Sequence, residues 1–251
     1  MRTVAELVRV SRPWVVAHRG YSARCPENTL CAFEAAIDAG ADVVELDVGL
    51  SADRVPFVLH DATLERTTNG RGPLHAHTAT ELEALDAGSW FAPEFAGERL
   101  PTLQAVLERI GAQVVLDIEL RPFAFESPAP DDALERQVHA LAERLGLLGS
   151  VMVSSFEHGF LTRTGDLPVG LVYAAPPEDA AARCRAHSAL FCALNAARAT
   201  HTDIRRLTHG GTRAVPYTVN DESEQRRLLD WGAGGIITDD PARLRDLLAQ
   251  R

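Results

Sequence analysis

Acidic and histidine side chains stand at the ends of short apolar runs in distant parts of the sequence. His18 follows the run 14–17, and Glu45 and Asp47 lie near the end of the run 42–48. Three further side chains of this kind occupy similar positions: His60, Asp117 and Glu119. Residues two apart in a strand share a face, so Glu45 and Asp47 point the same way. We therefore expect one site built from several strand ends.

Three carboxylates in this set offer the hard oxygen ligands that Mg²⁺ or Ca²⁺ prefers: Glu45, Asp47 and Glu119. Together they carry a charge of −3, which one divalent cation reduces to −1. The guanidinium groups of Arg19 and Arg121 then bring the site to +1, a charge that could hold a phosphodiester anion. The residue types therefore predict cation-assisted chemistry at a phosphate.

The two histidines are candidates for a general acid and a general base, because imidazole titrates near neutral pH. His18 and His60 arrive from separate strands, as such a pair requires. Less specific interpretations remain open. A single histidine at a strand end is more often structural, Glu45 and Asp47 could be a solvated strand end, and Arg121 could point to solvent.

Other polar residues are weaker candidates. We expect Asp117 to be a buried hydrogen-bonding residue, since Glu119 is followed two positions later by a basic residue. His75 and His77 have metal-like spacing, but they lie in a polar loop and are not assigned to a site. Five more histidines are predicted to be surface or packing residues: His139, His158, His187, His201 and His209.

The elements that would position these residues follow a regular order. β-Branched apolar runs occur at 14–17, 42–48, 114–120, 151–156, 169–174, 189–194, 214–219 and 235–238. Helical patterns lie between them at 29–39, 103–110, 132–145, 178–187 and 222–231. Runs that are apolar on both faces are typical of parallel strands covered on both sides. Eight strands, most followed by a helix, predict an α/β protein with a closed (β/α)8 barrel of the TIM type.

One run departs from this order. Residues 55–60 follow the second strand after a link of residues 49–54, which is too short for a parallel crossover, so a hairpin is predicted. Residues from about 61 to 102 contain no strong strand and are expected to be a small insertion. We therefore predict a single barrel domain over residues 1–251, with this insertion inside it.

Composition excludes several classes of protein. With 251 residues, 46% hydrophobic and 24% charged, the chain has ordinary globular composition. A formal charge of −10 disfavours a nucleic-acid partner. Four cysteines without a CxxC pair are expected to be free thiols. The N-terminal segment lacks the continuous apolar core of a signal peptide and no window predicts a transmembrane segment, so a cytoplasmic location is expected.

The order of motifs resembles the glycerophosphodiester phosphodiesterase family. The resemblance rests first on His18-Arg19-Gly20, Pro26-Glu27-Asn28-Thr29, Glu45-Leu46-Asp47-Val48 and His60-Asp61, and continues with 64–70. Shorter pieces agree at 100–103, 154–156, 218–221 and 235–239, so the match extends over about residues 14–241.

This resemblance implies a phospholipase-C-like barrel that hydrolyses glycerophosphodiesters to sn-glycerol 3-phosphate and an alcohol. It further implies that Glu45, Asp47 and Glu119 bind one divalent cation, Mg²⁺ or Ca²⁺, and that His18 and His60 are the acid/base pair. Arg19 would contact the phosphate. The attacking oxygen could be the glycerol hydroxyl or water.

Three positions depart from the family pattern. Arg121 replaces the usual Lys, Tyr217 replaces the usual Trp, and Gly234 stands where Asp is frequent. None of these changes removes an acid, a base or a metal ligand. We expect Arg121 and Tyr217 to contribute to substrate binding, and the departures to affect substrate preference more than catalysis.

Two other functions remain open. The first is a phospholipase-D-like activity on lysophospholipids, which would need an apolar groove. That groove could be lined by Trp90, Phe91, Phe95, Phe123 and Phe125, although these residues could equally pack the insertion onto the barrel. The second is a catalytically inactive barrel that binds a phosphodiester or a protein partner. The intact set of acids and histidines disfavours it.

Overall fold

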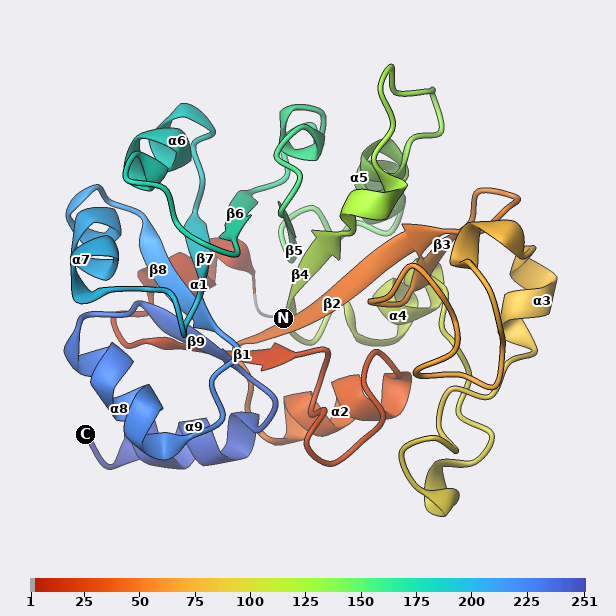
Figure 1. The fold of residues 1–251 in the computed structure, drawn as a ribbon, viewed down its shortest axis with the longest axis horizontal. Helices are drawn as coiled ribbons and strands as arrows, with labels where there is room; N and C mark the ends of the chain where they lie inside the picture. The colour runs from red at the N-terminus through yellow and green to blue at the C-terminus, as the bar shows by residue number, and fades with distance from the viewer. Residues whose placement is uncertain (1–2) are drawn as a thin grey trace.

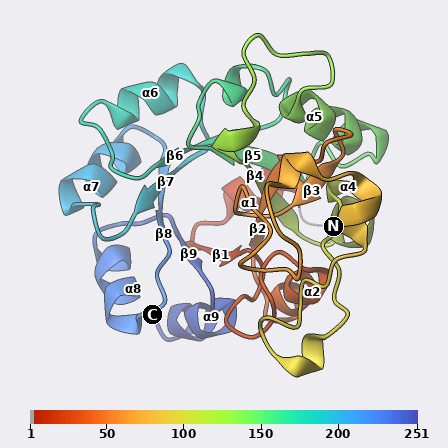
Figure 2. The ribbon, with the colours of Figure 1, turned by 45° about the vertical axis from the view of Figure 1, so that its right-hand side comes forward.

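The computed structural model describes residues 3–251 as a ring of parallel strands surrounded by helices (Figures 1 and 2). The parallel strands are β1 (Trp14–His18), β2 (Val43–Leu50), β4 (Val115–Leu120), β5 (Val151–Ser155), β6 (Val169–Tyr173), β7 (Phe191–Asn195), β8 (Arg213–Tyr217) and β9 (Gly235–Thr238). Neighbours pair in the order β8-β7-β6-β5-β4-β2-β1-β9. Backbone hydrogen bonds from Gly234 to Ala214 (2.8 Å) and from Val219 to Ile237 (2.9 Å) join the two ends of this order. The predicted eight-stranded barrel is confirmed.

The predicted hairpin is also confirmed. β3 (Pro56–Val58) pairs antiparallel with β2, with Val48 opposite Val58. The turn between them includes Arg54, whose φ of 66° lies in the left-handed region, and a Ser51 N–H bond to the Val55 carbonyl. The hairpin carries the chain to His60 at the same end of the barrel as the other strand ends.

Helices pack around the ring because their apolar faces cover the outer side of the strands. They are α2 (Leu30–Asp38), α4 (Leu103–Ile110), α5 (Leu134–Arg144), α6 (Ala180–Ala186), α7 (His201–His209), α8 (Glu222–Asp230) and α9 (Pro241–Ala249). The five predicted helices are present; α4 has the predicted bounds and the other four are slightly shorter. Asp221 caps α8 through its bond to the Glu224 N–H, and Gly40 and Gly146 follow helix ends with positive φ, as predicted.

Four helices were not predicted. α1 (Val4–Arg9) precedes the first strand, and α3 (Ala79–Glu83) is a short helix of five residues in the insertion. α7 was missed because its buried apolar face consists of only Ile204 and Leu207. α9 follows the last strand and begins at Pro241.

The insertion is built on the hairpin. Its buried apolar cluster combines Phe57 and Leu59, from β3 and the residue after it, with side chains of the insertion: Leu64, Leu74, Leu82, Ala87 and Leu100. The insertion includes α3 and the short 3-10 helices Leu74–Ala76 and Pro93–Phe95. Its apolar content is therefore larger than the sequence suggested, although part of that core belongs to β3.

Gly49 explains how loops approach β2 so closely. A Cβ atom at this position would lie 2.7 Å from the Phe123 ring and 2.8 Å from Leu74. The absence of a side chain therefore lets the insertion and the loop after β4 pack against the end of β2. No helix within residues 3–251 is long and apolar enough to span a bilayer.

Candidate active site

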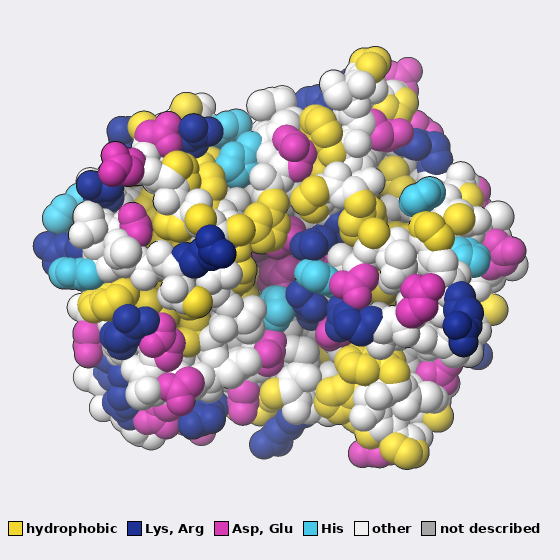
Figure 3. Space-filling model, in the orientation of Figure 1, with side chains coloured by type: hydrophobic (Ala, Val, Ile, Leu, Met, Phe, Trp, Pro, Cys, Tyr) yellow, Lys and Arg dark blue, Asp and Glu magenta, His cyan; other side chains and the backbone are white. Residues whose placement is uncertain are grey.

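Strand register brings the predicted site residues to one end of the barrel. His18 is paired with Glu45 between β1 and β2, and Asp47 is paired with Glu119 between β2 and β4. They line a cavity of about 140 Å³ together with His60. Figure 3 shows a hollow at the centre of this face, with acidic side chains in its depth and arginine and histidine side chains beside it. The predicted convergence of strand ends is therefore present.

A larger surface groove of about 820 Å³ lies elsewhere on the molecule. It runs beside β3, α4 and α5 and is lined by Arg54, Thr102, Leu141 and their neighbours. None of the acids and histidines predicted from the sequence for the active site lines this groove. The smaller cavity is the candidate active site because it gathers the reactive groups.

Three carboxylates form the floor of the cavity. One oxygen each of Glu45, Asp47 and Glu119 lies within 4.8 Å of the others, and all three residues belong to β2 or β4. Glu45 and Asp47 are 3% and 1% exposed. The site thus holds three hard oxygen donors in a buried position, where a bare negative charge is costly.

The charge balance of these acids is uneven. Burial and the neighbouring acids, Asp47 first, hold the pKa of Glu45 well above its ordinary value. Burial, with the charge of Asp47, raises the pKa of Glu119 to about 8. Burial also opposes ionisation of Asp47, but the guanidinium groups of Arg19 and Arg121 outweigh it and lower the pKa of Asp47. A divalent cation would remove this repulsion between the acids.

Asp117 lies beside the three-acid group without belonging to it. It faces Glu45 in the register of β2 and β4 and is 2% exposed. Burial raises the pKa of Asp117 to about 7, although a hydrogen bond from Ser154 acts in the opposite direction. Its Oδ1 atom has no hydrogen-bond partner in the structure. The expected buried position is therefore observed, with one carboxyl oxygen left unsatisfied.

The turn after β1 places Arg19 over the acids. Arg19 and Gly20 both have positive φ, 55° and 85°. A Cβ at Gly20 would lie 2.6 Å from the backbone of Ala32, so only glycine fits here. In this turn the Arg19 N–H donates to Glu45 Oε2 at 2.9 Å. The backbone itself therefore orients one of the three acids.

The Arg19 side chain and its neighbours hold Asp47. Arg19 Nε lies 3.3 Å from Asp47 Oδ2, and Arg19 NH1 donates to Glu27 Oε1 at 2.7 Å. Asn28 Nδ2 also donates to Asp47 Oδ2 at 3.0 Å. Glu27 and Asn28 belong to the family-like segment after β1, but the sequence alone assigned them no role.

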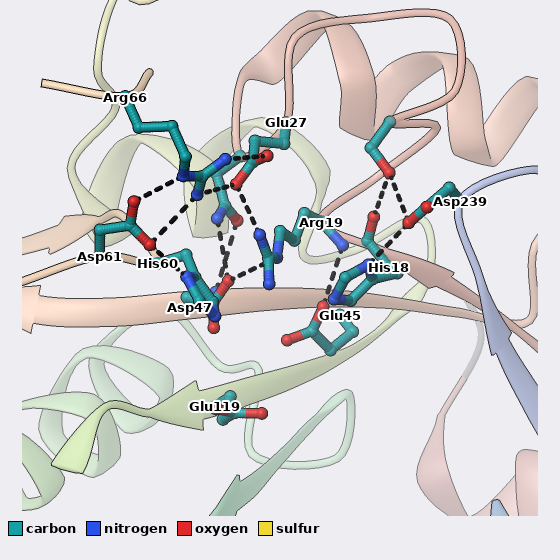
Figure 4. A network of polar contacts seen from close by, with 12 residues as sticks. His18, Arg19, Glu27, Glu45, Asp47, His60, Asp61, Arg66, Glu119 and Asp239 are labelled. Carbon is teal, nitrogen blue, oxygen red and sulfur yellow. Dashed lines mark hydrogen bonds and ion pairs between the residues drawn. The ribbon is translucent and has the colours of Figure 1, made fainter. Parts of the chain in front are cut away.

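Each candidate catalytic histidine contacts an aspartate (Figure 4). His18 Nδ1 lies 2.7 Å from Asp239 Oδ1, and His60 Nδ1 lies 2.6 Å from Asp61 Oδ1. An ionised carboxylate can only accept, so each Nδ1 carries the proton and each Nε2 is left for other partners. Neither aspartate was predicted from the sequence to be a site residue. Asp239 directly follows β9, so its position at a strand end was the available signal.

The His18–Asp239 pair is supported by three further residues. Asn220 Nδ2 donates to Asp239 Oδ2 at 2.6 Å, and Ser22 Oγ donates to Asp239 Oδ1 at 3.1 Å. Thr238 Oγ1 donates to Asn220 Oδ1 at 2.9 Å. Asn220 lies three residues after β8 and links the ends of β8 and β9.

Arg121 points into the site rather than to solvent. Its NH1 atom contacts Asp47 Oδ1 at 3.2 Å and also Glu119, and its side chain is 14% exposed. Tyr217 lines the opposite wall, where its ring meets Phe156 edge-on at 6.0 Å. The Tyr217 hydroxyl donates to the Tyr173 carbonyl at 3.0 Å, so the ring, and not the hydroxyl proton, faces the cavity.

The remaining sequence candidates lie outside the cavity. Neither His75 nor His77 lines the cavity or joins the candidate metal-binding group. His77 Nε2 contacts the Arg71 carbonyl at 2.8 Å instead. His158 and His187 have ring centres 6.0 Å apart, a packing contact that fits the predicted surface or packing role. All four cysteines are free thiols, and the sulfurs of Cys25 and Cys31 are 3.2 Å apart.

The aromatic residues considered for an acyl-chain groove do not line the cavity. Trp90, Phe91 and Phe95 pack edge-on against one another in the insertion, at 5.6 and 5.5 Å between ring centres. Phe125 packs edge-on against Phe160 at 5.0 Å. Phe123 lines a separate surface depression with His75. These contacts favour the packing interpretation of the aromatic residues.

Comparison with known proteins agrees with this geometry. Residues 18–243 match the model of the glycerophosphoryl diester phosphodiesterase family. The chain is 37% identical over 248 residues to a glycerophosphodiester phosphodiesterase of Caldanaerobacter subterraneus subsp. tengcongensis, covering 93% of this chain and 97% of the relative.

Solved structures show the same architecture. A phosphodiesterase of Oleispira antarctica in complex with the product sn-glycerol-3-phosphate superposes with a TM-score of 0.82 at 28% identity, covering 95% of this chain and 97% of that one. A glycerophosphodiester phosphodiesterase of Agrobacterium tumefaciens gives 0.77 at 30% identity, covering 95% and 100%. The chain therefore belongs to the glycerophosphoryl diester phosphodiesterase family and is a phosphoric diester hydrolase.

Proposed function

We propose that this enzyme hydrolyses glycerophosphodiesters to sn-glycerol 3-phosphate and an alcohol, using one divalent cation, Mg²⁺ or Ca²⁺. The observation that carries the proposal is the small cavity that three buried carboxylates and two aspartate-bound histidines share. Membership of the family and the product held by the Oleispira antarctica relative support the choice of substrate.

The proposed cation ligands are Glu45, Asp47 and Glu119. Their oxygens converge within 4.8 Å, and the raised pKa of Glu45, through burial and neighbouring charge, marks an unbalanced negative site. Carboxylate oxygen is the donor that Mg²⁺ and Ca²⁺ prefer, so the donor set fits such an ion. When bound, the cation supplies Lewis-acid polarisation of a phosphoryl oxygen.

His18 and His60 are the proposed proton-transfer pair. Both line the cavity, and both are held at Nδ1, so each offers Nε2 toward bound substrate. One neutral imidazole would accept the proton of the attacking oxygen, and one imidazolium would donate a proton to the leaving alcohol oxygen. The attacking oxygen is either the adjacent glycerol hydroxyl or a water, and the same pair serves both routes.

Substrate binding is assigned to the charged and aromatic walls of the cavity. Arg19 and Arg121 would attract the phosphodiester anion, and guanidinium groups suit phosphate oxygens geometrically. Tyr217, with Phe156 beside it, would contact the glycerol carbons through its ring. None of the five aromatic residues considered for an acyl-chain groove lines this cavity, which favours a water-soluble diester over a lysophospholipid.

The test measures the headgroup alcohol released from every substrate, and sn-glycerol 3-phosphate from the soluble diesters, after metal removal and after restoration with Mg²⁺ or Ca²⁺. Substrates should include several headgroups, for example glycerophosphocholine and glycerophosphoethanolamine, and a lysophosphatidylcholine. Restored turnover of the soluble diesters is the expected result. Equal turnover in a chelator would contradict the cation, faster turnover of the lysophospholipid would favour the alternative substrate, and no turnover of any diester would favour a binding protein.

A further inference from the structure

A guanidinium group from the insertion touches two carboxylates at the rim of the active site. Arg66 donates from Nε to Asp61 Oδ2 at 2.5 Å and from NH2 to Asp61 Oδ1 at 3.2 Å. It also donates from NH1 to Glu27 Oε2 at 2.7 Å and from NH2 to Glu27 Oε1 at 2.8 Å. Arg66 thus binds both carboxylates in a forked manner, the geometry in which an arginine is most restrained.

Both carboxylates have a second partner inside the site. Asp61 Oδ1 contacts His60 Nδ1 at 2.6 Å, and Glu27 Oε1 accepts a hydrogen bond from Arg19 NH1 at 2.7 Å. The side chains therefore form one continuous series, visible in Figure 4: His60, Asp61, Arg66, Glu27, Arg19 and Asp47. Its two ends come from different walls, because His60 follows β3 and Arg19 follows β1.

The middle of this series consists of Asp61, Arg66 and Glu27, which do not line the cavity themselves. Glu27 is 13% exposed and lies between two guanidinium groups, while Asp61 receives bonds from both Arg66 and His60. Burial opposes ionisation of Glu27, but Arg66 and Arg19 outweigh it and lower the pKa of Glu27. Without Arg66, Asp61 would keep only one of these two partners, and its carboxylate could rotate away from the imidazole.

We propose that Arg66 is a positioning residue that holds the His60 imidazole and the Arg19 guanidinium in their working geometry through Asp61 and Glu27. The inference rests on the proposed roles of His60 and Arg19. It also assigns the insertion a part in catalysis, because Arg66 belongs to the segment that follows His60-Asp61 and precedes the buried Leu74.

A purely structural role predicts something different. The Arg66 side chain is 43% exposed, and Glu27 and Asp61 would keep Arg19 and His60 as partners without it, so Arg66 should contribute little to folding. Removing Arg66 should therefore change the melting temperature little, whereas the loss of two oriented groups should reduce turnover strongly. Mutation of a residue that orients a functional group through a hydrogen bond typically lowers activity about 10–100-fold.

Arg54 provides a matched control. It lies in the turn between β2 and β3, its side chain is 33% exposed, and it binds Glu126 through two nitrogens at 3.1 and 2.7 Å. Its carboxylate partners are Glu126 and Asp132, and neither of them lines the cavity. Arg54→Gln therefore removes a similar forked ion pair without touching the site.

The experiment measures kcat, KM and melting temperature for Arg66→Gln, Arg66→Lys and Arg54→Gln with glycerophosphocholine. We expect Arg66→Gln to lower kcat about 10–100-fold with a smaller rise in KM, because His60 acts in the transition state and Asp47 still holds Arg19. Arg66→Lys should recover part of kcat, since one ammonium can bind only part of the two-carboxylate arrangement. Arg54→Gln should keep kcat within about twofold.

A double variant tests whether Arg66 acts through its neighbour. If it does, Arg66→Gln combined with Asp61→Asn should lose far less than the product of the two single losses. Additive losses, a kcat of Arg66→Gln within twofold of wild type, or an equal loss in Arg54→Gln would each overturn the inference.

His60→Ala separates this inference from the proposed function. Lost turnover in His60→Ala beside normal turnover in Arg66→Gln would overturn the role of Arg66 alone. Normal turnover in His60→Ala would overturn both the role of His60 and the positioning role that depends on it.

Discussion

His18 and Asp239 stand 221 positions apart in the sequence, yet His18 Nδ1 lies 2.7 Å from Asp239 Oδ1. They meet because β1 and β9 are neighbours in the barrel, with Ala17 paired with Thr238. The aspartate accepts the Nδ1 proton and so fixes the tautomer of the imidazole.

Replacing this aspartate should reduce turnover without unfolding the protein. We expect Asp239→Asn to lower kcat about 10–100-fold, because an amide can also donate to Nδ1 and so no longer fixes the tautomer and orientation of the imidazole. The measurement is kcat together with the melting temperature. Asp221→Asn, at the exposed cap of α8, is the matched control and should leave kcat unchanged. Unchanged kcat in Asp239→Asn would show that His18 does not depend on its partner.

The two histidines should give a bell-shaped dependence of the rate on pH, since one must be neutral and the other charged. Burial, assisted by Arg19 and Arg121, lowers the pKa of His60 despite the charge of Asp47. The limb of the pH–rate profile that reports His60 should therefore have its midpoint below about pH 6.5, the ordinary histidine pKa.

Each single alanine variant of this pair should lose about 10²–10⁴ in rate. His18→Ala combined with His60→Ala should lose less than the product, because both act in one proton-transfer cycle. Steady-state rates across pH for the three variants provide the measurement. A variant with a rate near wild type would exclude that histidine from the pair.

Loss of any proposed cation ligand should abolish cation-dependent turnover. Glu45→Gln, Asp47→Asn and Glu119→Gln each remove one of three anionic donors while keeping the side-chain shape. Titration calorimetry with Mg²⁺ or Ca²⁺ should show weakened binding, and circular dichroism should show an intact fold. Normal activity at saturating metal would remove that residue from the ligand set.

The Arg121 position tests how charge and shape contribute. Arg121 contacts Asp47 and Glu119, so its charge lies among the acids. Arg121→Lys keeps the charge and should lose about 1–2 kcal/mol of transition-state stabilisation through poorer geometry. Arg121→Met keeps the apolar stem but not the charge, so it should lose more and raise KM for the anionic substrate. Equal kinetics in the two variants would show that Arg121 is not a site residue.

Asp42, at the opposite end of the barrel, should contribute to the acid sensitivity of the fold. Burial opposes ionisation there, but hydrogen bonds from Arg12 (2.6 and 2.7 Å) and the Val15 N–H (3.0 Å), together with the charge of Arg245, lower the pKa of Asp42 to about 2. Because the pKa of Asp42 is lower in the folded protein than its ordinary value of 3.8, the ionised carboxylate stabilises the fold at pH values above 3.8. This stabilisation is lost as the pH falls toward 2. The contribution is about 2 kcal/mol.

Urea unfolding at several pH values between 6 and 2 provides the test. The free energy of unfolding should fall less steeply below pH 4 in Asp42→Asn than in wild type. Asp131→Asn, at an exposed carboxylate that contacts Arg136, should follow the wild-type curve. Identical curves for wild type and Asp42→Asn would contradict the assignment.

The sequence by itself determined the barrel and the positions of the reactive groups. Strands buried on both faces are largely apolar runs, so β1 and β6 could be found without knowledge of their partners. The two-residue spacing of Glu45 and Asp47 placed both on one face, because strand geometry is local. The short link before β3 likewise required a hairpin.

Only the tertiary structure decided which polar groups touch. Asp239 meets His18 because barrel closure places β9 beside β1, and Arg66 reaches Glu27 because the insertion folds back over the turn after β1. Whether Arg121 pointed to solvent or to Asp47 was undecided in the sequence for the same reason. Hydrophobic periodicity depends on neighbours a few positions away, whereas an ion pair depends on the paths of loops that are distant in the chain.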